Sequence, residues 1–174
     1  VISWYYLFPK KIIPSFKELF LSLWIGRAIN TILPVATIGG EIAKAHLLIL
    51  WGRPAKNVCA SVLVDKTVQA LALIPWAIIG TALLIFLAID NELAMYIMLG
   101  TFLLGLGLAG FIFVQRAGIF SFFANIIGKY NNTTDWGEIT LKATDIDLLV
   151  KDIYNDKKRF FVSILWRTLG LILQ

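Results

Sequence analysis

Two long apolar stretches without interruption dominate the pattern of hydrophobic and polar positions along the chain. Val68–Ile89 and Leu93–Val114 each run for 22 residues without a charged side chain. About 20 apolar residues in a helix are enough to cross the ~30 Å hydrocarbon core of a bilayer. The sequence therefore predicts membrane-spanning helices at 66–89 and 93–114, joined by the short loop 90–92.

Shorter apolar segments lie at the two ends of the chain. Residues 1–8 are typical of the end of a span, closed by Pro9, and residues 160–174 are typical of the start of a further span. Neither segment is long enough to cross a bilayer by itself. We therefore expect the chain to be part of one larger transmembrane domain, with further helices on both sides.

The composition agrees with a membrane protein. Of the 174 residues, 59% are hydrophobic and 16% are charged, whereas about 25% of the residues of a soluble domain are charged. The predicted class is an all-α, polytopic helical bundle in a membrane. The net charge of +5 does not indicate a nucleic-acid partner, because basic residues of membrane proteins mostly mark the side that a loop faces.

The loop charges predict the orientation. Lys and Arg residues gather in 9–18, 52–57 and 115–159, and loop 90–92 contains none. Short loops rich in Lys and Arg face the cytoplasm. The first three segments are therefore predicted to be cytoplasmic, and 90–92 is predicted to lie outside.

This orientation puts both ends of segment 19–51 on one face of the membrane. We interpret the segment as a re-entrant helical hairpin whose tip lies around Pro34–Gly40. Pro34 would break the first helix, and Gly39 and Gly40 would give the backbone freedom to reverse. The alternative is a helix that crosses the membrane once, in which case the flanking charges do not report the sides of the two loops.

Residues 116–159 are predicted to form cytoplasmic amphipathic helices. Arg116–Tyr130 is rich in Phe and Ile, as in a helix that lies in the membrane interface. A second helix is predicted to begin at Thr144, where Asp147 completes a capping box. Its apolar side chains recur at helical spacing, so we expect one face to pack against the membrane domain.

Polar residues cluster in and just after the hairpin. A charged side chain at the bilayer centre costs at least ~2.5–3.5 kcal/mol, so polar groups there indicate a buried or water-lined site. Arginine suits a phosphate or carboxylate partner, because its planar fork makes two parallel hydrogen bonds. The alternative is a structural ion-pair network that only holds the hairpin. The candidate substrate-binding residues are Arg27, Asn30, Pro34, Gly40, Glu41, Lys44, Asp65 and Lys66.

Signatures of catalysis are absent from the sequence. The single histidine, His46, has no neighbours at metal-ligand spacing, and no nucleotide-binding or hydrolase motif occurs. We therefore predict no catalytic residue, metal or cofactor. Gly100, Gly105, Gly107 and Gly110 are interpreted as positions of close helix packing.

At Arg27, Asn30, Pro34, Gly40-Glu41, Lys44, Gly52 and Asp65-Lys66 the chain resembles the flippase-like membrane domain family, which includes the membrane half of lysylphosphatidylglycerol synthases. Residues 33–41 and 145–166 are most similar to its hopanoid-biosynthesis-associated branch. The chain departs from the pattern at Lys44, where an arginine is common.

The resemblance implies a lipid translocase of the bacterial inner membrane that moves a phospholipid or a hopanoid-type lipid between leaflets. Lipid-biosynthesis enzymes are the implied protein partners. Two alternatives stay open. One is a membrane module that presents lipid to a separate transferase domain, and the other is a scaffold that transports nothing.

Overall fold

The computed structural model describes residues 1–32, 38–86, 91–118, 121–122 and 136–172. Over these residues the chain forms α-helices and one short 3-10 helix, with no strand, so the predicted all-α class is confirmed. The elements are α1 (Ile2–Tyr5), η1 (Lys10–Ile12), α2 (Phe16–Ile32), α3 (Ile38–Leu50), α4 (Ala55–Leu71), α5 (Leu73–Phe86), α6 (Asn91–Ala117), α8 (Trp136–Asn155) and α9 (Lys157–Ile172).

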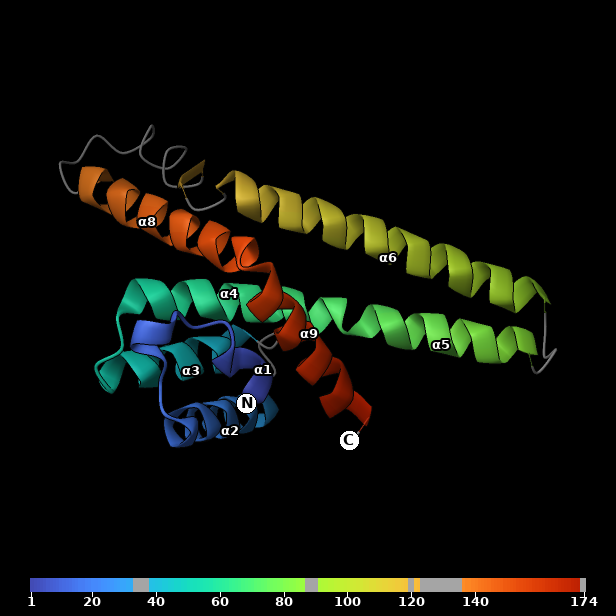
Figure 1. The fold of residues 1–174 in the computed structure, drawn as a ribbon, viewed down its shortest axis with the longest axis horizontal. Helices are drawn as coiled ribbons and strands as arrows, with labels where there is room; N and C mark the ends of the chain where they lie inside the picture. The colour runs from blue at the N-terminus through green and yellow to red at the C-terminus, as the bar shows by residue number, and fades with distance from the viewer. Residues whose placement is uncertain (33–37, 87–90, 119–120, 123–135, 173–174) are drawn as a thin grey trace.

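Helices α4 and α5 form one long rod, and α6 runs back beside it (Figure 1). The rod is interrupted only at Ala72. Pro75 lies in the first turn of α5 and has no N–H to donate to the carbonyl of Leu71, which explains the break. By length and composition, Ala55–Leu83 and Met95–Ala117 are able to cross a membrane, and they overlap the predicted spans.

The remaining helices surround α4, not α5. Helix α8 lies along one side of α4, while α1, α2 and α3 lie on the other, and α9 crosses in front (Figure 1). The core is therefore built around α4. Its largest side chains come from α1 and the residues just after it, and from α2, α3, α4 and α8: Trp4, Leu7, Phe8, Leu19, Leu48, Val58, Val64, Val68, Val150 and Tyr154.

Helix α8 begins earlier than predicted, at Trp136 instead of Thr144. The buried positions Ala143, Asp147, Val150 and Tyr154 share one face, so the pattern that packs on the core already starts before Thr144. Thr144 therefore lies inside α8 and does not begin it, so the expected capping box is not at the start of the helix. The carboxylate of Asp147 accepts a 2.7 Å hydrogen bond from the backbone N–H of Ser121. Most of the helix predicted at 116–130 lies outside the described residues.

Candidate functional site

The site begins at the close contact between α2 and α3. A Cβ atom added to Gly26 would lie 2.7 Å from the carbonyl oxygen of Gly40, and one added to Gly40 would overlap the carbonyl oxygen of Gly26 and the side chain of Asn30. Only glycine at both positions lets the two backbones approach this closely. The hairpin contact is therefore specified by this glycine pair.

Asn30 joins the two helices by a hydrogen bond. Its Oδ1 atom accepts a 2.7 Å bond from the backbone N–H of Gly40. The first four N–H groups of a helix have no partner inside that helix, and Gly40 is in the first turn of α3. Asn30 thus caps α3 from the neighbouring helix. Pro34, predicted to be at the tip, lies outside the described residues.

A buried ion network lies directly behind this contact. Lys44 is 2% exposed, and its Nζ atom lies 2.5 Å from Oε2 of Glu41 and 2.9 Å from Oδ2 of Asp65. Lys66 binds the other oxygen of Glu41 at 2.6 Å. Gln69 donates a 2.9 Å hydrogen bond to Asp65. The network ties α3 to α4 and neutralises the buried charge of Lys44.

Arg167 of α9 joins the same network, although the sequence analysis did not select it. Its guanidinium lies 3.9 Å from Oδ1 of Asp65, an oxygen without a hydrogen-bond donor among the described residues. A signal was present in the sequence, because Arg167 is the one charged residue in the apolar segment 160–174. A lone charge in such a segment points to a functional or paired site.

Arg27 differs from the other charges. Its side chain is exposed, and it forms no ion pair with any carboxylate in the described part of the chain. It lines a pocket of about 230 Å³ together with Asn30, Gly40, Glu41, Lys44, Lys66, Gln69 and Arg167. Asp65 lies behind Lys44. Four basic side chains thus face two carboxylates, which leaves a formal charge of +2 at the pocket.

Seven of the eight predicted site residues are therefore brought together. A family model described as lysylphosphatidylglycerol synthase TM region matches residues 1–174, the whole of the chain. The chain belongs to this family. No curated protein matched it, and no solved structure did.

Membership of the lysylphosphatidylglycerol synthase TM region family confirms the predicted resemblance. It identifies the chain as a membrane domain of a family that is named for lipid modification, and so as a domain in contact with a lipid bilayer. The hopanoid-associated branch stays a prediction.

A second polar cluster of this family member joins α4, α6 and α8. Thr67 donates a 3.0 Å hydrogen bond to Oε1 of Gln115, and the hydroxyl of Tyr154 contacts both side chains. Burial raises the pKa of the Tyr154 hydroxyl, against the opposing effects of Thr67 and Arg116. The cluster fixes the end of α6 against α4. The sequence analysis missed it, because single polar residues on three distant helices form no local pattern.

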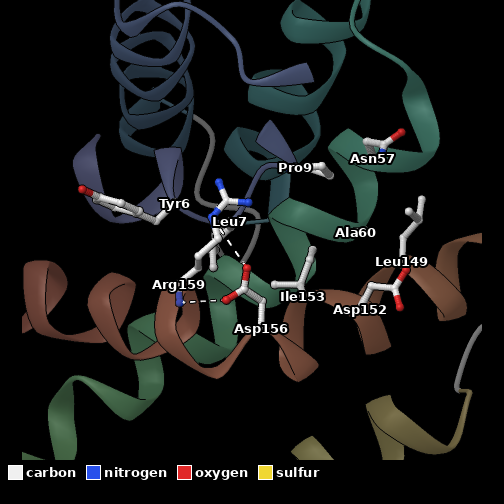
Figure 2. Close-up of a pocket in the computed structure, with 10 residues that line it drawn as sticks. All are labelled: Tyr6, Leu7, Pro9, Asn57, Ala60, Leu149, Asp152, Ile153, Asp156 and Arg159. Carbon is white, nitrogen blue, oxygen red and sulfur yellow. Dashed lines mark hydrogen bonds and ion pairs between the residues drawn. The ribbon is translucent and has the colours of Figure 1, made fainter. Parts of the chain in front are cut away.

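Another pocket, of about 210 Å³, lies between residues 6–9, α4, α8 and the start of α9 (Figure 2). It contains the carboxylates of Asp152 and Asp156 and the guanidinium of Arg159. Arg159 contacts Asp156 and donates a hydrogen bond to the carbonyl of Phe8. These charges are partly paired with each other, and among the described residues no cluster of His, Cys, Asp and Glu is suited to a metal.

Proposed function

We propose that this domain moves a membrane lipid between leaflets, and that the lipid headgroup binds in the pocket lined by Arg27. The observation that carries the proposal is the contrast among the basic side chains. Lys44, Lys66 and Arg167 each contact a carboxylate, whereas Arg27 has no carboxylate partner among the described residues and lines a pocket of net positive charge. A guanidinium without a carboxylate partner suits a phosphate. An anionic phospholipid therefore fits this pocket better than a neutral hopanoid-type lipid.

The depth of the pocket along the rod supports this role. The candidate span of the rod is Ala55–Leu83, and at 1.5 Å per residue Lys66 lies about 16 Å from its start. The hairpin of α2 and α3 packs against α4 and not against α5. With Ala55 at the boundary predicted to be cytoplasmic, the charged pocket lies inside the ~30 Å hydrocarbon core. A headgroup would bind there on a polar route through the hydrocarbon.

A second candidate function is the presentation of lipid to a separate transferase domain. The family description favours it, because it names a synthase that modifies a lipid. A pure scaffold is less well supported. The paired charges suit a structural role, but Arg27 forms no ion pair that would join the described helices.

Transport by the full-length protein in liposomes tests the proposal. Three fluorescent lipids would be compared: phosphatidylglycerol, phosphatidylcholine and a neutral polycyclic lipid. We expect Arg27→Gln to slow movement of phosphatidylglycerol about tenfold or more, the effect of losing a charge-assisted contact. Lys17→Gln is the matched control, because it removes one exposed charge from the same helix outside the pocket.

Two outcomes would contradict the proposal. In the first, the parent moves none of the three lipids. In the second, Arg27→Gln and Lys17→Gln transport phosphatidylglycerol as fast as the parent. Faster movement of the polycyclic lipid than of phosphatidylglycerol would instead favour the hopanoid-type substrate.

A further inference from the structure

A larger hollow adjoins the charged pocket. It measures about 440 Å³ and lies between α1, α2 and α9. Phe16 and Phe20 of α2 and Trp166 and Leu169 of α9 give it a mostly apolar wall. All four side chains are more than 40% exposed. The described part of the chain therefore leaves a row of large apolar side chains uncovered around a cavity.

The two cavities meet at the same pair of arginines. Arg27 and Arg167 line both the charged pocket and the apolar hollow. A third hollow of about 220 Å³ also includes Arg27, with Phe20 and Trp24 beside it. The site as a whole is thus charged at one end and apolar at the other, and its cationic groups lie at the boundary.

We propose that the apolar hollow binds an acyl chain of the lipid whose anionic headgroup binds in the charged pocket. The lipid then enters sideways from the membrane, between α2 and α9. This inference rests on the proposed function and adds the position of the tail and the route of access. Arg27 and Arg167 line both cavities, so the charged pocket and the apolar hollow are continuous. This continuity favours a lipid, because an amphiphile needs a charged and an apolar environment within the length of one molecule.

Photolabelling of the full-length protein in liposomes tests the tail site. The probe is a phosphatidylglycerol with a diazirine in one acyl chain, and its partner is a phosphatidylcholine with the same chain. We expect the anionic probe to label residues 16–20 and 166–171 in a saturable way. Labelling of α6, whose candidate span is 0% buried, should instead rise in proportion to the amount of probe.

A pair of glycine variants makes the test specific. Gly170 lines the hollow, and a Cβ atom added there meets nothing within 4 Å. Gly170→Phe should fill the hollow and lower the saturable labelling about tenfold, because it displaces several buried methylenes of the chain. Gly107→Phe is the matched control, since Gly107 is equally open but lies on α6. Gly170→Leu is a smaller second variant, for which we expect a smaller loss.

The outcomes separate this inference from the proposed function. Three results would each overturn the tail site. Labelling of residues 16–20 and 166–171 would not saturate, the neutral probe would label them equally, or Gly170→Phe would have no effect. No labelling there at all, the result expected if a protein segment fills the hollow, would overturn it too. If Arg27→Gln still slows transport, the proposed function stands without the tail site. Saturable labelling in a parent that transports nothing would retain the lipid site and reject translocation.

Discussion

Two helical hairpins in the described part of the chain are built in opposite ways. In the hairpin of α2 and α3, the glycines Gly26 and Gly40 are in backbone contact, and Asn30 bridges the two helices. In the hairpin of α5 and α6, Cβ atoms added to Gly80 or Gly107 would meet nothing within 4 Å. The same residue type therefore makes a close contact in one hairpin and faces open space in the other.

This difference corrects an expectation from the sequence. The sequence predicts close helix packing at Gly100, Gly105, Gly107 and Gly110. Within the described part of the chain this prediction is wrong, because a Cβ atom added at any of the four would meet nothing within 4 Å. At the base of this hairpin, polar contacts such as that between Thr67 of α4 and Gln115 hold the end of α6 against α4. A glycine pattern indicates where helices are able to approach, and a capping or ionic partner decides where they do.

The largest effect should come from breaking the ion network that holds the first hairpin. Asp65→Ala would leave Lys44 buried with Glu41 as its one ion-pair partner among the described residues, so we expect a loss of about 3–5 kcal/mol in the free energy of unfolding. Thermal unfolding in detergent measures it. The control pair is Lys56 and Asp145, which are 55% and 52% exposed, and removing either should cost at most ~1 kcal/mol. Equal losses at the two pairs would contradict a buried network.

A methyl group in the glycine contact should come next. Gly40→Ala would place a Cβ atom against the backbone of α2, and we expect a loss of stability of about 1–3 kcal/mol, as for other overpacked sites. Gly107→Ala is the counterpart in the second hairpin and should be neutral or slightly stabilising, since it replaces a glycine in an open helical position. Chemical denaturation of both variants in mild detergent checks the contrast, which fails if the two respond alike.

The cap from Asn30 should contribute less. Asn30→Ala removes the acceptor for the N–H of Gly40, so we expect a loss of about 1 kcal/mol, typical of a helix cap. Thr31→Ala is the neighbouring control, because its hydroxyl only donates to the carbonyl of Arg27 in the same helix. Hydrogen exchange at the start of α3 should rise in the first variant and stay unchanged in the second.

The smallest effect is a pH dependence at the base of the second hairpin. Burial raises the pKa of Tyr154 above its ordinary value of 10.0, so the unfolded chain loses this proton at lower pH than the folded protein does. The stability due to Tyr154 is then fully present below pH 10 and decreases as the pH rises through the raised pKa. The free energy of unfolding of Tyr154→Phe should therefore decrease less at alkaline pH than that of the parent. Unfolding of both proteins between pH 8 and about 11 measures the difference. Identical pH profiles would contradict it.

Much of the candidate site could be predicted because its residues are marked by local contrast. A charge in an apolar segment is unusual wherever it occurs, and this rule selected Arg27, Glu41, Lys44, Asp65 and Lys66. The same rule applied to the last segment would have found Arg167. The start of α8 was misjudged because a capping-box motif at Thr144 was given more weight than the buried face that extends back to Ala143.

The sequence by itself determined the all-α class, the family and most of the polar residues at the candidate site, because hydrophobic periods and isolated charges are properties of neighbouring positions. Only the tertiary structure decided which charges pair. Lys44 is enclosed between Glu41 and Asp65, while Arg27, on a facing helix, has no carboxylate partner in the part of the chain that the structure describes. That distinction depends on how α2, α3, α4 and α9 cross, and helices distant along the chain leave no record of their crossing in the local sequence pattern.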